Sequence, residues 1–150
     1  MQTITPFLWF DGKVGAAMKF YGSVFKETRI VSVNGSGKNV MSATIRLNGQ
    51  ELILFNGGPL FKFTEAVSFV VSCKTQKEID YYWKRLTKGG EASRCGWLKD
   101  RFGLSWQIVP DILSELLGDD DSVKAGRAMQ AMLKMTKLDI KVLRQAHAGR

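Results

Sequence analysis

Residues that most often carry nucleophilic or metal chemistry are scarce in this chain of 150 residues. His147 is the only histidine and lies three residues from the C-terminus, whereas Cys73 and Cys95 stand in different segments. A His-centred triad, a His–Cys dyad or a site of several histidines therefore cannot be built in the body of one chain. No Cys-x-x-Cys motif is present, and this cysteine usage predicts a reduced, cytoplasmic protein.

Two carboxylates and one thiol are the remaining candidates for acid, base or nucleophile. Glu65 and Asp100 could act as general bases if the fold buries them, although carboxylates beside turns are more often solvated. Cys95 has Arg94 and Lys99 near it in the sequence, and cations lower the pKa of a thiol. Because no histidine can partner Cys95, we interpret it as an inert, half-buried thiol.

Large side chains on the expected strands predict a ligand pocket. Ligand pockets are mostly apolar with a few polar anchors, so these residues as a group suit an apolar or aromatic ligand, while core packing is the alternative for each one. The predicted ligand-binding residues are Phe7, Trp9, Phe55, Phe61, Trp97, Trp106 and Gln107. Loop residues expected at the rim are Asn56, Phe63, Glu65, Cys95 and Asp100. A turn is expected over Lys99–Phe102 before the last strand. Trp97 and Asp100 are expected to bracket it and to shape the pocket mouth or a subunit contact.

Apolar spacing in the first part of the chain predicts a strand, a helix and three more strands. Asn48-Gly49 is typical of a hairpin turn, because both residue types accept positive φ. The predicted elements are a strand in 3–10, a helix in 13–26 and strands in 29–33, 40–47 and 51–55, with a loop over 56–65.

The same order of elements begins again after this loop. Thr75 is expected to cap a helix, because Glu78 follows at the capping-box spacing. The predicted elements are a strand in 66–73, a helix to about residue 87 and strands in 92–95 and 104–109. An offset of 62 residues places Phe7 on Phe69, and an offset of 54 aligns the last strands. The repeat predicts two similar modules, each a curved sheet with a helix on its outer face.

Residues 111–150 are predicted to be helical, and the acidic run Asp119–Asp121 is expected to cap a helix that begins at Ser122. Most of the net charge of +8 lies after this run. The segment 122–150 holds seven basic residues and one acid, Asp139, which is expected to cap the last helix. We expect its apolar stripes to pack against the core or a second subunit while Lys and Arg face water. No nucleic-acid-binding motif is recognisable, and no apolar run approaches the ~18 residues of a membrane span. Neither nucleic acid nor membrane is therefore predicted as a partner.

Four segments of the chain resemble the PhnB-like proteins of the vicinal-oxygen-chelate superfamily, which includes glyoxalase I, bleomycin-resistance proteins and extradiol dioxygenases. The segments are ITPFLWFDG (Ile4–Gly12), NGGPLFKFTEAVSF (Asn56–Phe69), CGWLKDRFGLSWQIVP (Cys95–Pro110) and KAGRAMQAMLKMTKLDI (Lys124–Ile140). Members often carry the name 3-demethylubiquinone-9 3-methyltransferase. The resemblance implies an α+β fold in which residues 1–110 form paired βαβββ modules, about 1–58 and 64–110, as a curved mixed sheet. It also implies a homodimer, and residues 111–150 would be a C-terminal helical extension.

Members of this superfamily normally hold a divalent metal through His, Glu or Gln on the first and last strands of each module. The equivalent positions here fall near Pro6, Ser68, Ile53 and Gln107, and only Gln107 has a usable oxygen. A catalytic metal generally needs three or more protein ligands, so we predict no glyoxalase-type metal centre. The Gly-rich loop of a doubly wound sheet is also missing, so methyl transfer from S-adenosylmethionine is not expected and no cofactor is predicted.

Two functions of different classes remain open. The first is metal-independent binding of a small apolar or aromatic molecule in a sheet pocket, as in resistance proteins that sequester a drug. The second is an enzyme that acts on a small substrate with Gln107 and a carboxylate as polar anchors. The lack of histidine and of a full set of metal ligands favours the first.

Overall fold

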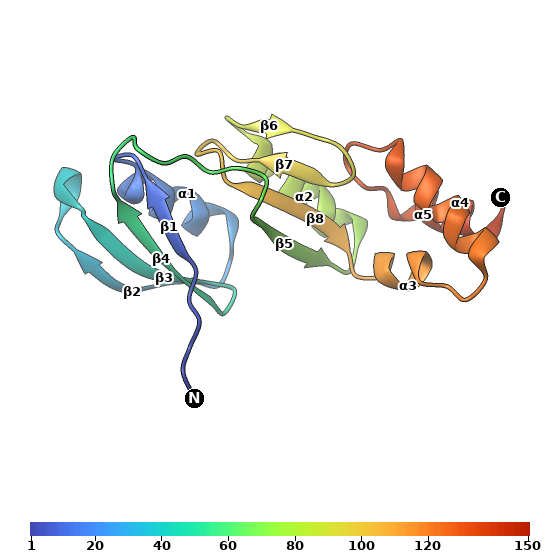
Figure 1. Ribbon diagram of the computed structural model, residues 1–150, viewed down its shortest axis with the longest axis horizontal. Coiled ribbons are helices and arrows are strands. Elements are labelled where there is room, and N and C mark those ends of the chain that lie inside the picture. The colour runs from blue at the N-terminus through green and yellow to red at the C-terminus, as the bar shows by residue number, and fades with distance from the viewer. The chain divides into compact units, whose positions relative to one another are not determined.

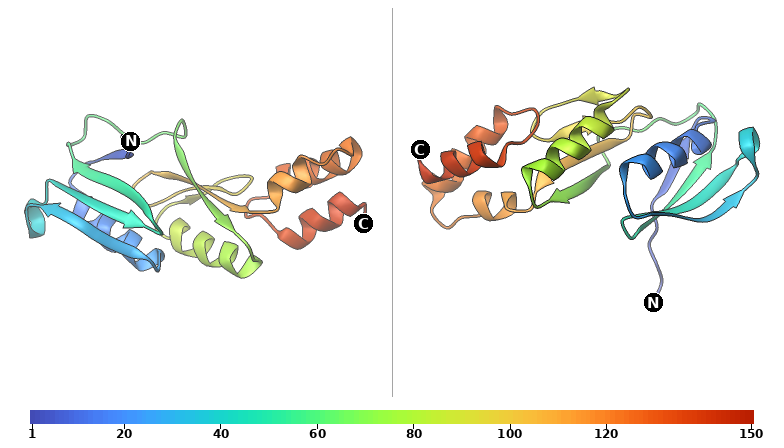
Figure 2. Two further views of the ribbon diagram at one scale, coloured as in Figure 1. Left: turned by 90° about the horizontal axis from the view of Figure 1, so that it is seen from below. Right: turned by 180° about the vertical axis from the view of Figure 1, so that it is seen from behind.

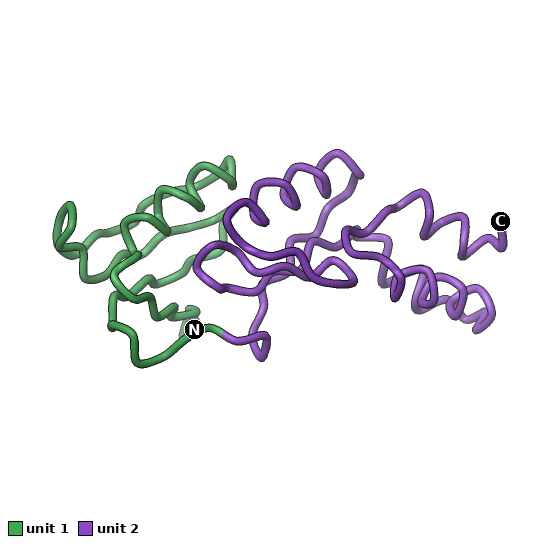
Figure 3. Tube along the Cα trace, turned by 90° about the horizontal axis from the view of Figure 1, so that it is seen from above, with its two compact units in different colours: residues 1–63 green, residues 64–150 purple.

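The computed structural model describes every residue from Met1 to Arg150. The chain forms two compact units, residues 1–63 and residues 64–150 (Figure 3). Each unit has its own sheet and helices. None of the helices combines the length and the apolar character that a membrane crossing requires.

Unit 1 is a four-stranded mixed sheet with a helix on one face (Figures 1 and 2). Its elements are β1 (Phe7–Phe10), α1 (Val14–Val24), β2 (Thr28–Asn34), the short 3-10 helix η1 (Gly37–Asn39), β3 (Ser42–Leu47) and β4 (Gln50–Asn56). The strand order is β1-β4-β3-β2, with β1 parallel to β4 and the other neighbours antiparallel.

The core of unit 1 lies between α1 and the sheet. Val14, Ala17 and Tyr21 on α1 have no exposed surface, and neither do Ile45 on β3 and Leu54 on β4. Side chains alternate between the two faces of a strand, so the residues between these buried ones point away from α1. The sheet therefore has one buried face and one open face.

Unit 2 repeats this arrangement. Its sheet contains β5 (Ser68–Cys73), β6 (Glu91–Ala92), β7 (Trp97–Lys99) and β8 (Ser105–Pro110), in the order β5-β8-β7-β6 with β5 parallel to β8. The helix α2 (Gln76–Thr87) follows β5. Its predicted cap is confirmed, because the Thr75 hydroxyl accepts a hydrogen bond from the Glu78 N–H at 3.2 Å. Two α+β modules of the predicted βαβββ order are thus confirmed.

The turn expected over Lys99–Phe102 is present, but the residues before it form a strand that was not predicted. Trp97–Lys99 forms β7 and pairs with β8, and the turn that follows is closed by a 2.9 Å hydrogen bond from the Gly103 N–H to the Asp100 carbonyl. Gly103 has φ +85°, which a glycine adopts without strain. Three strand residues are too few to show a period of two, and this explains why β7 was not predicted.

Three helices follow β8 and belong to unit 2: α3 (Leu113–Leu117), α4 (Ser122–Leu133) and α5 (Ile140–Ala148). Both predicted acidic caps are confirmed. Asp121 accepts from the Val123 N–H and Asp139 accepts from the Val142 N–H, each at 3.0 Å. The helices enclose a small core of their own, made of Leu116, Ala128, Leu138 and Leu143.

Backbone hydrogen bonds join this helical extension to the rest of unit 2. The N–H groups of Cys95 and Gly96 donate to the carbonyls of Met135 and Thr136 at 2.9 and 2.8 Å. The Gln76 side chain donates to the Leu138 carbonyl at 3.1 Å and accepts from the Ile140 N–H at 2.9 Å. The extension thus packs against its own module, one of the two placements that the sequence left open.

Two of the seven basic side chains in the extension have structural partners. Arg127 donates to the carbonyls of Ala146 and His147 at the end of α5, and Lys137 pairs with Asp80 at 2.7 Å. The remaining five are exposed: Lys124, Lys134, Lys141, Arg144 and Arg150.

The internal overlay needs a shift of one residue in the first strands. Phe7 lies opposite Ile53 in unit 1, whereas Gln107 in unit 2 lies opposite Val70 and not Phe69. Phe69 pairs instead with Trp106, which is buried. Both strands are apolar on both faces here, so bulk alone does not specify the register.

Candidate functional site

Four aromatic side chains gather on the open face of unit 1. The ring of Phe55 lies 5.4 Å from that of Phe7 and 5.3 Å from that of Trp9, and Phe61 lies 5.0 Å from Trp9 on its other side. We call Phe7, Trp9, Phe55 and Phe61 the aromatic cluster. All four were predicted from the sequence as ligand-binding residues, and the fold brings them together from β1, β4 and the loop after β4.

The loop after β4 holds Trp9 in place. The Trp9 indole N–H donates to the Gly58 carbonyl at 2.9 Å. A side chain at Gly57 would place its Cβ 2.2 Å from the indole ring, so only glycine fits against this face of Trp9. Asn56 fixes the start of the loop, because its side chain accepts from the Val14 N–H at 3.1 Å and donates to the Val40 carbonyl at 2.7 Å.

The cluster remains open to solvent. Phe7 is 57% exposed and Phe61 is 60% exposed, while Trp9 and Phe55 are half-buried. Phe63, expected at the rim, stacks edge-on against Phe10 at 5.3 Å instead of joining the cluster. An exposed group of aromatic rings on a fixed backbone is a surface suited to an apolar partner.

Two further predicted residues, Trp97 and Gln107, share the open face of unit 2. They are cross-strand partners on β7 and β8, so their side chains project from the same face. The Gln107 amide donates to the Ser68 hydroxyl at 3.0 Å. Gln107 therefore has a structural partner within its sheet.

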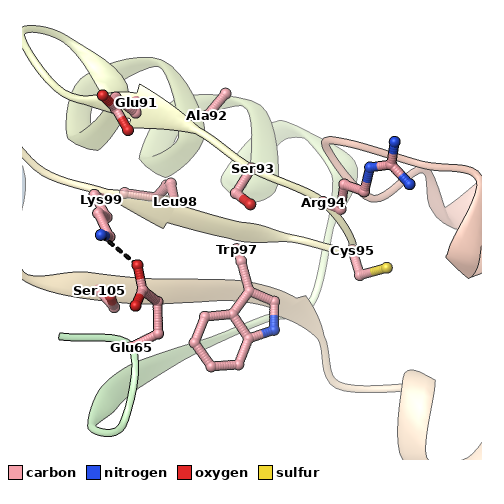
Figure 4. A pocket seen from close by; sticks show the side chains of 10 residues that line it. All are labelled: Glu65, Glu91, Ala92, Ser93, Arg94, Cys95, Trp97, Leu98, Lys99 and Ser105. Carbon is pink, nitrogen blue, oxygen red and sulfur yellow. Dashed lines mark ion pairs between the residues drawn. The ribbon is translucent and has the colours of Figure 1, made fainter.

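A cavity of about 460 Å³ lies beside Trp97 in unit 2 (Figure 4). Lys99 on β7 and Glu65 on the preceding loop form an ion pair at this cavity. Their mutual hydrogen bond lowers the pKa of Glu65 and raises that of Lys99. Ser105 also lines the cavity, and its hydroxyl is buried without a hydrogen-bond partner.

Neither Ser105 nor Lys99 was predicted from the sequence as a site residue. Lys99 lies on β7 and Ser105 on β8, where the two are cross-strand partners. The i, i+2 spacing of Trp97 and Lys99 could have indicated that the two side chains share one face of a strand. It was not used, because this segment was not predicted as a strand.

The structure gives Asp100 and Trp106 structural roles. Asp100 is 2% exposed and its carboxylate accepts hydrogen bonds from the N–H groups of Phe102 and Leu104 at 2.8 and 3.1 Å. It also accepts from the Trp106 indole N–H at 2.9 Å, and Trp106 is 3% exposed. Neither side chain is presented to a ligand by unit 2, and Asp100 has its oxygens engaged in closing the β7–β8 turn.

The two cysteines differ in their surroundings. Cys73 is fully buried, and burial raises the pKa of its thiol to about 11. Cys95 is half-buried in the left-handed region at φ 57°, and its thiol lies 3.5 Å from the Met132 carbonyl. Both thiols are free, and no histidine lies beside either of them in the sequence.

The positions that hold a metal in the superfamily do meet in pairs, but they do not fit a metal. The Ile53 N–H donates to the Pro6 carbonyl at 3.0 Å, and Gln107 bonds Ser68. Proline and isoleucine offer no side-chain ligand, and the Gln107 amide is held by a serine. The structure also gathers no group of three or more His, Cys, Asp or Glu side chains suited to a metal ion.

Each of the two modules has the order β-α-β-β-β, and in each sheet the first strand runs parallel to the last. This arrangement defines the glyoxalase/bleomycin resistance class of folds. The chain belongs to the 3-demethylubiquinone-9 3-methyltransferase family, whose model matches residues 2–109. A PhnB protein from Bacillus cereus is 37% identical, and the match covers 73% of this chain and 99% of that one with a TM-score of 0.66. The resemblance stated from the sequence is thus confirmed.

More distant solved structures share the fold alone. Protein PA1353 from Pseudomonas aeruginosa is 18% identical with a TM-score of 0.59, and the match covers 74% of this chain and 100% of that one. The fosfomycin resistance protein FosX from Listeria monocytogenes, solved with Mn(II) and sulfate, is 14% identical with a TM-score of 0.55. That match covers 71% of this chain and 89% of FosX. No match was found among curated proteins.

Proposed function

We propose that this protein binds a small apolar or aromatic molecule, without a metal, at the aromatic cluster of unit 1. The observation that carries the proposal is the set of four rings on one open sheet face, two of them more than half exposed. Edge-to-face contacts between aromatic rings add about 0.5–1.5 kcal/mol each beyond the area they bury. The cluster already holds its rings in such contacts, so a ligand ring would meet a preformed surface.

The chemistry of the donor set supports binding without a metal. FosX from Listeria monocytogenes was solved with Mn(II). This chain has proline, isoleucine and serine at three of the four positions where the superfamily resemblance expects metal ligands. The name of the family implies methyl transfer. Two small mixed sheets, however, provide neither the doubly wound sheet nor the Gly-rich phosphate loop typical of such enzymes, so we do not assign that activity.

Catalysis on a small substrate is the second candidate, and Gln107 is the residue that favours it. Its amide stands on an open sheet face beside Trp97 and could orient a polar group. The two candidate bases do not support this alternative. Asp100 is engaged by three hydrogen bonds, and the pairing of Glu65 with Lys99 lowers the pKa of the carboxyl group. Turnover in a substrate panel that is lost in Gln107→Ala would favour catalysis.

Truncation of the cluster tests the proposed function. We expect Phe61→Ala to weaken binding of 2-naphthol, a neutral aromatic probe, by about fivefold to tenfold, because a ring contact is lost. Leu60→Ala is the matched control, since Leu60 is 75% exposed on the same loop. Equal affinity of the two variants, measured by NMR titration, would show that the cluster is not the binding surface.

We also propose that the protein forms a homodimer. The edge strand β2 supports this, because Ile30, Val31 and Val33 are each more than 40% exposed on it. Exposed edge strands with apolar side chains readily pair with another chain. Light scattering that gives the mass of one chain, about 16.8 kDa, would contradict the dimer.

A further inference from the structure

The cavity of unit 2 contains a feature that the aromatic cluster does not explain. Ser105 is 1% exposed, and its hydroxyl is the one buried side-chain polar atom without a hydrogen-bond partner. Buried polar groups are nearly always hydrogen-bonded, and an unpaired one is destabilising. Ser105 lines the cavity together with Lys99, its cross-strand partner, so the hydroxyl and the ammonium group share one face of the sheet.

The cation at this cavity is held by a replaceable carboxylate. Glu65 stands on the loop between the two units' sheets, and its side chain is 61% exposed where it pairs with Lys99. Exposed ion pairs contribute little to stability, so a ligand anion can displace Glu65 at small cost. Lys99 belongs to β7 and keeps its position through the β7–β8 pairing.

The remaining groups restrict the charge and shape of that anion. Glu91 is the cross-strand partner of Lys99 on β6, so one carboxylate stays near the cation after Glu65 has left. This arrangement suits a single negative charge better than the double charge of a phosphate group. Trp97 projects from the same face as Lys99 and offers an indole ring beside the anion position (Figure 4).

We propose that the cavity of unit 2 is a second binding site, for a small aromatic monocarboxylate. The ligand carboxylate replaces Glu65 on Lys99 and accepts a hydrogen bond from Ser105, while its ring packs on Trp97. Glu65 is then an internal competitor that occupies the cation when the ligand is absent. The site uses no residue of the aromatic cluster, so it stands independently of the proposed function.

Titration of the full chain with benzoate tests this site, with benzamide and phenyl phosphate as the neutral and dianionic comparisons. We expect benzoate to bind with a dissociation constant in about the millimolar range, more tightly than either comparison, and to shift the NMR signals of Lys99 and Ser105. Shifts confined to unit 1, or no saturable shift, would overturn the proposal.

Variants separate competition from simple charge effects. Glu65→Gln is expected to tighten benzoate binding by at least about threefold, whereas Lys99→Gln and Ser105→Ala are expected to weaken it by about tenfold and threefold. Glu51→Gln is the matched control, because Glu51 forms a similar exposed pair with Arg46 at 3.1 Å in unit 1. If Glu65→Gln and Glu51→Gln have the same effect, or if Lys99→Gln binds benzoate unchanged, the site is refuted. Each variant is checked for folding by circular dichroism before titration.

Discussion

At the level of single residues, Trp9 depends on a glycine beside it. A methyl group at position 57 would come within 2.2 Å of the indole ring, and the ring is also tied to Gly58 by its hydrogen bond. We therefore expect Gly57→Ala to lower the free energy of unfolding by roughly 1–3 kcal/mol, as overpacking does. Urea unfolding measures the change.

Gly126→Ala is the control for this substitution. Gly126 lies within α4, and a Cβ there would meet no atom within 4 Å. Alanine in a helix is favoured over glycine by about 0.5–1 kcal/mol, so this variant should be more stable. If Gly57→Ala were as stable as Gly126→Ala, the described packing of Trp9 would be wrong.

The two thiols are expected to react at very different rates. Burial raises the pKa of Cys73 to about 11, so at pH 8 roughly one molecule in a thousand carries its thiolate. Peptide mapping after brief iodoacetamide treatment at pH 8 should find Cys95 modified and Cys73 intact. Labelling of both thiols at the same rate would contradict the buried environment of Cys73, and labelling in urea provides the unfolded reference.

The ion pair between Glu65 and Lys99 stabilises the fold over a defined pH range. Its hydrogen bond lowers the pKa of Glu65 from the ordinary 4.5. The contribution of the carboxylate to folding stability is therefore complete above pH 4.5 and is lost as the pH falls through the lowered pKa of the folded state. The pKa of Lys99 is raised from 10.5, so the contribution of the ammonium is complete below 10.5 and lost at higher pH. An NMR titration of the Glu65 carboxyl carbon should give a midpoint below 4.5 that rises in Lys99→Gln. An unchanged midpoint would show that the pair does not form in solution.

At the level of elements, Gln76 joins the start of α2 to the start of α5. Its side chain makes hydrogen bonds to the Leu138 carbonyl and the Ile140 N–H. Gln76→Ala leaves both groups without this partner, and we expect the opening free energy of α5 to fall by about 1–2 kcal/mol. Hydrogen exchange should show faster exchange in α5 and unchanged exchange in α1.

The control for Gln76 is Gln130→Ala, because Gln130 is exposed on α4. In Gln130→Ala, the backbone amides of α5 should exchange hydrogen at the same rate as in the unmodified chain. If α5 exchanges at the same rate in both variants, the extension does not depend on the Gln76 bridge for its attachment.

The sequence predicted the elements better than the faces they present. Helix caps at Thr75, Asp121 and Asp139 were predictable because capping is local chemistry. The strand β7 and the one-residue shift between Phe69 and Val70 were not, because strand pairing is set by partners distant in the sequence. Four of the seven predicted ligand-binding residues meet in one cluster. Trp106, in contrast, is buried, and its indole N–H donates a hydrogen bond to Asp100.

At the level of the whole molecule, the net charge of +8 divides equally between the two units. Residues 1–63 carry seven Lys/Arg and three Asp/Glu, and residues 64–150 carry fifteen and eleven. Five exposed cations lie on the extension of unit 2, whereas the aromatic cluster lies in unit 1. The single histidine lies in the extension as well, where it contacts Asp119 at 2.8 Å and ties the end of α5 to the loop before α4.

The most direct test of metal-independent ligand binding is an NMR titration of the chain with 2-naphthol, performed once with EDTA and once with added Mn(II). We predict saturable shifts of the Trp9 indole N–H and of the β1 and β4 amides, with the same dissociation constant in both titrations. Binding that requires Mn(II), or saturable shifts that leave the Trp9 signal in place, would contradict the account.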